Sequence, residues 1–530
     1  MKKIKILPVY PEFPHTFWSF KRALKYVGKK ATMPPTGLAT VASMFPTEYF
    51  EIQKIVDLNT ERLKDEQIKE SDLVMISSMI IQENSQNEII DKIHFYKKPV
   101  VVGGPFSTEY PERNSKADYI VSGEAEITLS AFIEDYLNGK PRKIYTEENV
   151  INEDRCKVKL NQFNKPYLDQ TQIPRWDLLN LKNYNSVPIQ YSRGCPNKCE
   201  FCDIIELFGR VTRTKSPEQM IRELNALFNT GFRGSVYIAA DNLMGNKKNF
   251  EEFLSKQINW QLLNKNPFSY ISEASIDLGW EENKNICGMM SMANYNKVFI
   301  GIESTDSDAL KTAGKEKNIK IPIEDAIMNI QNSGIEVTAG VIIGMDGEKP
   351  NVFEDLYNLA QKTGIVEFMP SFLTALKSTK LYKRLKEENR IKGESTGNNT
   401  HQLYFNFKPK LDESFLINGY KGLIKKLYDP KNYYERDRIL QKNLGDNARL
   451  ENRKNFMGYI AFIKSIKNRL FAKGGFQYAK HFYKTAMENP KYIPELVTRA
   501  IKLDDLMTIT KKTLDDNSYT IFNNNILSKP

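Results

Sequence analysis

The sequence contains few cysteines and no long apolar run. Five cysteines in 530 residues are too few for a disulfide framework, so the reducing cytoplasm is the expected location. No apolar segment approaches the roughly 18 residues that are needed to span a bilayer, which argues against an integral membrane protein. The chain reaches Pro8 and Glu12 before an apolar core of signal-peptide length can form, so secretion is not expected either.

Acidic residues are scarce at one end of the chain. Residues 401–530 contain 24 Lys and Arg against 13 Asp and Glu, an excess equal to the net charge of +11 of the whole sequence. Such an excess of positive charge can bind an anionic partner or a membrane surface. Alternatively, it can be the solvated face of helices that pack through their aromatic side. We favour the solvated face, with peripheral membrane contact as the alternative. Nucleic-acid binding is not expected.

The first 145 residues alternate short β-branched runs with helix-like segments, which is typical of a doubly wound, flavodoxin-like parallel sheet. The expected strands are residues 3–10, 50–58, 73–79, 99–105 and 119–124. Ligands of such sheets bind beyond the carboxyl ends of the strands. The candidate binding residues at that edge are Ser77, Ser78, Gly103, Gly104 and Glu124.

A proline-containing connector, residues 146–185, leads to a second alternating series. Its six βα units over residues 186–390 predict a partial, TIM-like (β/α)6 barrel, with chemistry at the carboxyl ends of its strands. The expected strands are residues 189–193, 235–241, 270–276, 297–304, 336–345 and 365–375. Ser216 followed by Pro217 predicts the start of a helix that extends to residue 229.

The remainder of the chain is helical, basic and aromatic in pattern. We expect a helical domain over residues 391–515 and a loose tail over 516–530. The candidate helices are residues 420–428, 433–444, 459–471 and 478–487. The length of the chain agrees with several domains of this kind, because one hydrophobic core does not extend over 530 residues.

The decisive feature is a C-x3-C-x2-C motif formed by Cys195, Cys199 and Cys202, directly after the first strand of the second series. Three thiolates can hold three irons of a [4Fe–4S] cluster and leave the fourth iron open to a small chelating molecule. A structural zinc site is the alternative, but zinc needs a fourth Cys or His nearby. Cys156 lies in the separate connector and no histidine is close to the motif, so we favour the iron–sulfur cluster.

With Phe201 in the aromatic position, the motif resembles the signature of radical S-adenosylmethionine (SAM) enzymes. Further similarity over residues 1–440 is carried by 33–38 (MPPTGL), 101–105 (VVGGP), 213–216 (RTKS), 240–248 (ADNLMGNKK), 273–276 (EASI) and 299–303 (FIGIE). These segments look like cobalamin-binding radical SAM proteins with a helical C-terminal domain of the DUF4070 type. The sequence is most similar to the hopanoid C2-methylase type of class B radical SAM methyltransferases.

The resemblance implies roles for residues at the strand ends. Cys195, Cys199 and Cys202 would ligate the cluster, and SAM would chelate the open iron. The implied contacts to SAM are Phe201 beside the adenine, Asp241 and Asn242 at the methionine moiety, Ser275 and Glu303 at its polar groups or the ribose, and Ile343 and Gly344 at the adenine. Ala240 and Ser304 depart from the usual family residues, which indicates a differently shaped substrate pocket.

The resemblance also implies cobalamin at the edge of the first sheet, with its base displaced and no histidine ligand from the protein. The sequence agrees, because His94 does not stand in a D-x-H-x-x-G motif. The implied activity is methyl transfer to an unactivated carbon of a lipid or natural product, through a 5′-deoxyadenosyl radical and methylcobalamin. A flavodoxin or ferredoxin would donate electrons.

Two other functions remain open at this stage. One is a cobalamin-dependent radical rearrangement or oxidation without methyl transfer. The other is a corrinoid-binding or metal-binding module without catalysis. Methylthiolation of tRNA is disfavoured, because the sequence lacks the extra N-terminal cysteines of a second cluster.

Overall fold

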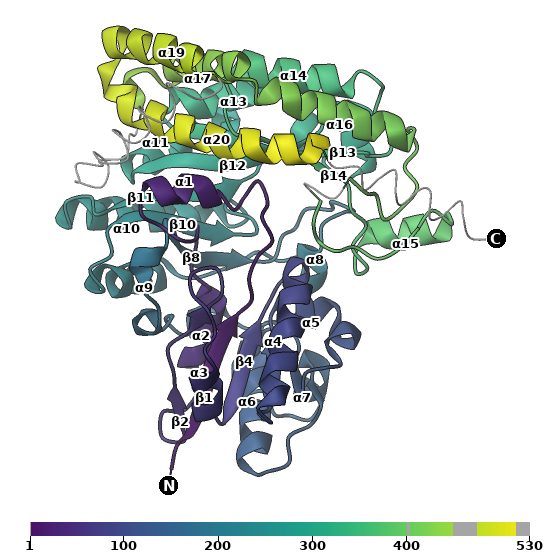
Figure 1. Ribbon diagram of the computed structural model, residues 1–530. Helices are drawn as coiled ribbons and strands as arrows, with labels where there is room; N and C mark the ends of the chain where they lie inside the picture. Colours follow the sequence, from purple (N-terminus) through teal and green to yellow (C-terminus); the bar gives the residue numbers. More distant parts are fainter. Residues whose placement is uncertain (1, 400–402, 449–473, 516–530) are drawn as a thin grey trace. The chain divides into compact units, whose positions relative to one another are not determined.

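A computed structural model describes residues 2–399, 403–448 and 474–515 (Figure 1). The chain divides into two compact units. The first unit contains Met1–Pro14, Lys30–Cys195 and Ile204–Asp241, and the second contains His15–Lys29, Pro196–Asp203 and Asn242–Pro530.

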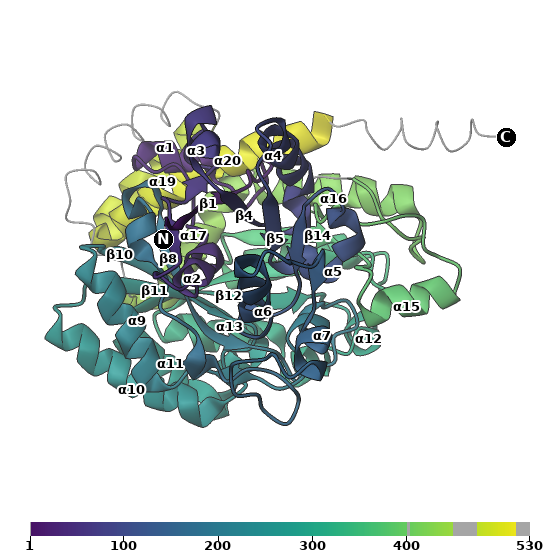
Figure 2. The same ribbon diagram turned by 90° about the horizontal axis from the view of Figure 1, so that it is seen from below.

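The first unit contains a parallel sheet in the order β2-β1-β4-β5-β6-β7, with β3 also paired to β1. Figure 2 shows its strands β1, β4 and β5 side by side. Its strands are β1 Ile4–Tyr10, β2 Phe50–Ile52, β3 Val56–Asp57, β4 Leu73–Ser77, β5 Val100–Gly103, β6 Tyr119–Val121 and β7 Ile144–Tyr145. The doubly wound fold predicted from the sequence is therefore confirmed. The predicted second strand is divided into β2 and β3, and β7 was not predicted.

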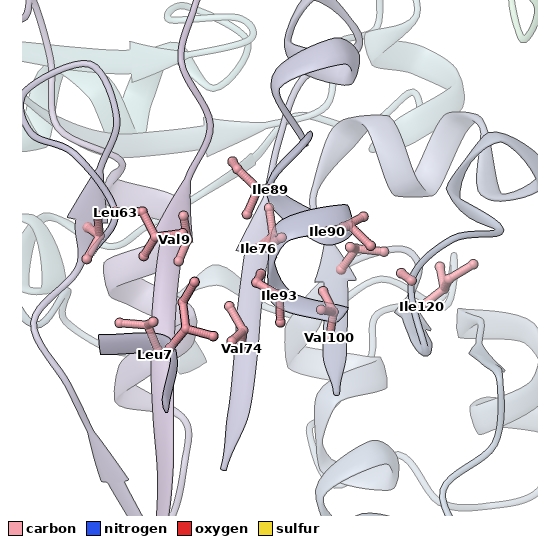
Figure 3. Close-up of a cluster of buried hydrophobic side chains, with 14 residues drawn as sticks. Leu7, Val9, Leu63, Val74, Ile76, Ile89, Ile90, Ile93, Val100 and Ile120 are labelled. Carbon is pink, nitrogen blue, oxygen red and sulfur yellow. The ribbon is translucent and has the colours of Figure 1, made fainter. Parts of the chain in front are cut away.

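Aliphatic side chains fill one face of this sheet beneath helices α3 (Asp65–Glu70) and α4 (Glu83–Phe95). Figure 3 shows Leu7, Val74 and Val100 from three neighbouring strands together with Ile90 and Ile93 of α4, and all five are fully buried. Each such side chain stabilises the fold by roughly 1.5–3 kcal/mol. Helices α2 (Thr36–Ser43), α5 (Pro105–Glu109) and α6 (Ala125–Leu137) also pack against these strands.

The first unit also contains the start of the second βα series. Strand β8 (Ser186–Arg193) lies between β10 (Gly234–Ala240), which is parallel to it, and β9 (Arg213–Thr214), which is antiparallel. Helix α9 (Pro217–Asn229) confirms the helix predicted there, because the Ser216 side chain accepts a hydrogen bond from the backbone N–H of Gln219. The short strand β9 was not predicted.

The second unit continues the series with four parallel strands in chain order. They are β11 (Phe268–Ala274), β12 (Tyr295–Glu303), β13 (Glu336–Ile343) and β14 (Phe368–Phe372). The helices between and around them are α10 (Lys247–Leu263), α11 (Lys284–Met292), α12 (Ser307–Thr312), α13 (Ile323–Asn332) and α14 (Val352–Thr363). The predicted βα alternation is confirmed in both units.

Helices follow the last strand, as predicted for the C-terminal region. They are α15 (Lys380–Glu387), α16 (Glu413–Leu427), α17 (Pro430–Leu444), α19 (Gly475–Glu488) and α20 (Ile493–Asp515). Helix α20 was not predicted, and the expected helix over 459–471 and the tail over 516–530 lie outside the described residues. None of the described helices is long and apolar enough to cross a membrane.

Helix α20 contacts two distant parts of the second unit. Along one side it packs against α1 (Lys21–Tyr26), so segments from near both ends of the chain lie side by side (Figure 1). On another side Arg499 pairs with Glu336 at 2.9 Å and with Asp437 at 2.5 Å, while Lys502 pairs with Glu367 at 2.7 Å. These buried ion pairs attach α20 to α17 and to the region where β13 and β14 begin.

Candidate active site

A cavity of about 360 Å³ lies at the carboxyl ends of β4, β5 and β6 in the first unit. Four of the five residues predicted for this edge line the cavity: Ser77, Gly103, Gly104 and Glu124. Most of the other lining side chains are aliphatic, including Leu38, Val41, Met44, Met75, Val101 and Leu129. The cavity therefore suits a largely apolar group more than a highly charged one.

At this edge, Gly104 approaches a neighbouring strand closely, and Ser78 points away from the cavity lining into a buried hydrogen bond. Gly104 has φ +89°, and a Cβ there would lie only 2.5 Å from the Ser77 Oγ, so the position requires glycine. The fifth predicted residue, Ser78, does not line the cavity. Its buried hydroxyl donates a hydrogen bond to the Gln86 Oε1 at 2.5 Å, which is a structural contact.

The same cavity is bounded by the start of the second βα series. Pro188, Gln190 and Arg193 of β8 line it, together with Ala239 of β10 and Phe208. A ligand in the cavity would therefore touch both the doubly wound sheet and the strand that leads to the cysteine motif.

Four buried charged residues connect that strand to helix α6 within the first unit. Arg193 pairs with Glu124 at 2.6 Å and with Glu126 at 2.9 Å, and Arg213 pairs with Glu124 at 2.7 Å. Burial alone would raise the pKa of Glu126, but the Arg193 guanidinium outweighs burial and lowers this pKa to about 2. The carboxylate of Glu124, expected to bind a cofactor, thus already has two arginine partners.

The backbone before Cys195 is fixed by contacts within the first unit. Gly194 has φ +85°, and a Cβ there would lie 2.5 Å from the carbonyl oxygen of Val211. Its N–H donates to the Asp241 Oδ2 at 2.8 Å, and the Cys195 N–H donates to the carbonyl oxygen of Gly209 at 3.2 Å. Asp241, predicted to contact SAM, therefore also supports the start of the cysteine loop.

The rest of the motif belongs to the second unit. Cys199 is buried, Cys202 is half-buried, and the Cys202 N–H donates to the carbonyl oxygen of Cys199 at 3.4 Å. All five cysteines lie in the part of the chain that the structure describes, and none of them forms a disulfide there. Within the described ranges, no three His, Cys, Asp or Glu side chains are gathered closely enough to hold a metal ion. The donor set nevertheless fits an iron–sulfur cluster chemically, because the motif supplies three thiols within eight residues and thiolates are the ligands that such clusters require.

Glu303 ends strand β12 with an unusual backbone conformation. Its φ of +66° is rare for a residue with a side chain. The buried carboxylate lies 2.8 Å from the Nζ of Lys315. Outliers of this kind often mark functional positions, which agrees with the predicted role of Glu303 at SAM.

The loop after β13 is held by Glu348. The Gly344 N–H donates to the Glu348 Oε2 at 2.8 Å. Burial raises the pKa of Glu348 to about 8, against the hydrogen bonds from the backbone. Gly344 itself has φ +95°, and a Cβ there would lie 2.4 Å from the Phe405 ring, so glycine is required at this predicted adenine contact.

The other predicted SAM contacts are distributed as follows. Phe201 is half-buried beside the cysteines, Asn242 is buried after β10, and Ile343 is fully buried at the end of β13. Ser275 is half-buried and precedes the 3-10 helix Ile276–Gly279. Their contacts to SAM stay predictions.

Arg384 of helix α15 contacts both the cysteine loop and the loop after β13. Its guanidinium donates to Glu200 at 2.8 and 2.9 Å and to Asp346 at 2.8 Å. The Leu381 N–H also donates to the carbonyl oxygen of Glu200 at 2.7 Å. Helix α15 therefore supports the cysteine loop directly.

Comparisons with known proteins agree with this arrangement. Residues 29–133 match the B12 binding domain, 189–360 match the radical SAM superfamily, and 379–518 match DUF4070, a domain of unknown function. An uncharacterized methyltransferase of Synechocystis is 38% identical over 82% of this chain and 78% of its own length. Hopanoid C-2 methylase of Rhodopseudomonas palustris is 32% identical over 73% of this chain and 71% of its own length.

The chain belongs to the cobalamin-dependent radical SAM methyltransferase family. Solved structures of the same fold include OxsB, a cobalamin-dependent SAM radical enzyme with aqua-cobalamin bound, at TM-score 0.59 and 14% identity over 98% of this chain and 81% of that one. They also include the methyltransferase TsrM from Kitasatospora setae, at TM-score 0.55 and 16% identity over 72% and 76% of the two chains.

Membership confirms several expectations from the sequence. As a radical SAM methyltransferase of this family the protein is an enzyme, and its cofactors are a [4Fe–4S] cluster, SAM and cobalamin. The fold class is confirmed as well, with a doubly wound cobalamin-binding domain, a radical SAM domain of parallel βα units and a helical C-terminal region.

Sequence reasoning missed two residues of this radical SAM enzyme. Lys315 and Arg384 received no role, although both lie beside the cysteine loop. Arg384 is 184 residues from its partner Glu200, so no local pattern could have found the pair. For Lys315, the only signal was its position shortly after Glu303.

Proposed function

We propose that the protein transfers a methyl group to an unactivated carbon of a lipid or a natural-product-like small molecule. The kinship with a methylase of hopanoid lipids supports an apolar substrate. Family membership accounts for the methyl transfer. What we propose here is the chemical class of the molecule that accepts the methyl group.

The cavity of the first unit is the single observation that carries the placement of the methyl donor in this proposal. It is lined both by the cobalamin-binding domain, at Ser77 and Gly103, and by the radical SAM domain, at Gln190 and Arg193. A corrinoid seated there would lie against the strand that leads to Cys195. The mostly apolar lining suits an apolar part of the cofactor. The cavity has no histidine among its described lining residues, so we propose no cobalt ligand from the chain.

When bound, the cluster and SAM supply a 5′-deoxyadenosyl radical, and cobalamin supplies the methyl group. The chain's own part is to bind, orient and exclude water. Cys195, Cys199 and Cys202 would hold the irons, and Asp241 would fix the loop through the Gly194 N–H. Asn242, Ser275, Glu303, Phe201, Ile343 and Gly344 would surround SAM.

We also propose the domain boundaries, the electron donor and the role of the basic helical surface. We assign residues 1–145 to the cobalamin-binding domain, 146–185 to a connector, 186–390 to the radical SAM domain and 391–515 to the helical domain. A flavodoxin or ferredoxin would supply electrons, and the basic helical domain would present a solvated outer face.

The experiment is product analysis of the reconstituted enzyme under anaerobic conditions. With a lipid or natural-product substrate, methylation should give S-adenosylhomocysteine and 5′-deoxyadenosine together, with a methylated product. Formation of 5′-deoxyadenosine without S-adenosylhomocysteine would contradict methyl transfer and favour a radical rearrangement or oxidation. One zinc per chain and no cleavage of SAM would indicate a non-catalytic module.

A further inference from the structure

The turn after helix α12 contacts the cysteine loop through its backbone, within the second unit. The Glu200 N–H donates to the carbonyl oxygen of Ala313 at 3.1 Å. Gly314 has φ +71°, and a Cβ there would lie 2.7 Å from the carbonyl oxygen of Lys198. The turn therefore touches residues on both sides of Cys199, and the contact is too close for a side chain at position 314.

The next residue, Lys315, places an ammonium group in the same region. Its side chain is 13% exposed, and its Nζ lies 2.8 Å from the Glu303 Oε1 and 3.4 Å from the carbonyl oxygen of Gly301. Burial lowers the pKa of Lys315, but the charges of Glu303, Cys199 and Cys202 outweigh burial and raise it above its usual value. The lysine is therefore a cation held beside Glu303, directly after the turn that contacts the cysteine loop at Lys198 and Glu200.

The carboxylate that faces Lys315 is itself held in place. Glu303 is the last residue of β12, and Asn318 fixes the two residues before it. The side-chain amide of Asn318 donates to the carbonyl oxygens of Gly301 at 3.0 Å and Ile302 at 2.8 Å. A Cβ at Gly301 would lie 2.4 Å from the Glu303 Oε1, so this glycine leaves the space for the carboxylate. The geometry of the Lys315–Glu303 pair is thus determined by the fold on both sides.

We propose that Lys315 is a positioning residue whose fixed positive charge raises the reduction potential of the iron–sulfur cluster. Potentials of such clusters depend on the net charge, hydrogen bonding and solvent exposure around them. A buried cation beside the cysteine loop stabilises the reduced cluster, which carries one more negative charge, and the effect is strong because the local dielectric is low. The step is the uptake of one electron from the external donor, and the lysine forms no bond and releases no proton.

The inference rests on the proposed ligation of the cluster by Cys195, Cys199 and Cys202. The test is a redox titration of the anaerobically reconstituted, full-length enzyme, followed by electron paramagnetic resonance. We expect Lys315→Met to shift the midpoint potential to a more negative value and Lys315→Arg to keep the wild-type potential. At limiting reductant, cleavage of SAM by Lys315→Met should fall about 10- to 100-fold, the range for residues that support metal ligands.

Lys317→Met is the matched control, because Lys317 is two residues further on and pairs with Asp277 at 2.9 Å. It should leave the midpoint potential unchanged. An equal shift in the Lys317 variant would overturn the proposal, since the effect would then follow from net charge in general. An unchanged potential in iron-loaded Lys315→Met would overturn it as well.

If Lys315→Met does not retain its irons, Glu303→Gln decides between the outcomes. Loss of the negative charge beside Lys315 should shift the potential to a more positive value, and an unchanged potential would overturn the proposal. A failure of the cluster ligation itself would be recognised separately, because wild-type protein would then contain no irons.

Discussion

Cys199 is buried in the middle of the cysteine motif, and it provides the first test at the scale of single residues. We expect Cys199→Ala to abolish formation of 5′-deoxyadenosine and to lose most of the roughly four irons of the reconstituted protein, because a cubane with one thiolate fewer is poorly held. Iron analysis and product chromatography measure both effects.

Cys156→Ala is the control for this variant, because Cys156 lies outside the motif and is half-buried. It should retain both the irons and the cleavage of SAM. Persistent 5′-deoxyadenosine formation by Cys199→Ala would contradict the cluster ligation.

Glu348 gives a prediction about pH dependence. The pKa of this carboxyl is about 8 in the folded protein, against an ordinary value of 4.5. Below both values the folded and the unfolded chain carry the proton equally. As the pH rises from about 4.5 to about 8, the carboxyl ionises in the unfolded chain but not yet in the folded one. The free energy of unfolding therefore falls over this range by up to about 1.4 kcal/mol per pH unit. Above about pH 8 this contribution is constant.

We expect Glu348→Gln to remove this part of the pH dependence, as measured by chemical denaturation at several pH values. Glu316→Gln, at an exposed position, should keep the wild-type slope. Identical slopes for wild type and Glu348→Gln would show that Glu348 is ionised throughout. Because Glu348 holds the Gly344 N–H, the same titration reports on the predicted adenine-binding loop.

At the scale of elements, helix α20 depends on buried charges for its attachment. Replacement of Arg499 by Met leaves Glu336 and Asp437 without their arginine partner in a buried environment. Breaking a buried ion pair in this way costs about 3–5 kcal/mol. We expect Arg499→Met to lower the free energy of unfolding by this amount in denaturant titrations.

Lys511→Ala on the same helix is the control, because Lys511 is exposed. Its effect should stay within about 0.5 kcal/mol. A similar stability for both variants would mean that apolar packing alone attaches α20. Packing does contribute, since Val497 and Ile501 of α20 are buried beside Ala23 of α1.

For the whole molecule, the structure and the family matches predict that the two metal cofactors can be removed separately. Val41 lines the cavity of the cobalamin-binding domain, and Val41→Trp should fill part of that space. We expect this variant to lose its corrinoid, measured by absorption, and to keep about four irons. Cys199→Ala should show the reverse pattern.

Glu48→Trp adds the same side chain at an exposed position and should keep both cofactors. If Val41→Trp retained a full complement of corrinoid, the cavity would not be the binding site. If it lost the irons together with the corrinoid, the two sites would depend on each other through the fold.

The sequence by itself determined the order of βα units, the cysteine motif and the edge at which Ser77, Gly103 and Gly104 meet a cavity. These features depend on local periodicity, close spacing and the direction of parallel strands, all of which are readable along the chain. The cysteine spacing indicated the iron–sulfur cluster, and the family resemblance added SAM and cobalamin.

Only the tertiary structure decided which groups surround the cysteine loop and how the ends of the second unit are held. Glu200 meets Arg384 across 184 residues, Ala23 of α1 meets Asp505 of α20 across 482, and Lys315 is brought to Glu303 by the turn at Gly314. Contacts over such separations leave no periodic pattern in the sequence. They arise because buried charges must find partners when the chain closes, and the fold selects those partners.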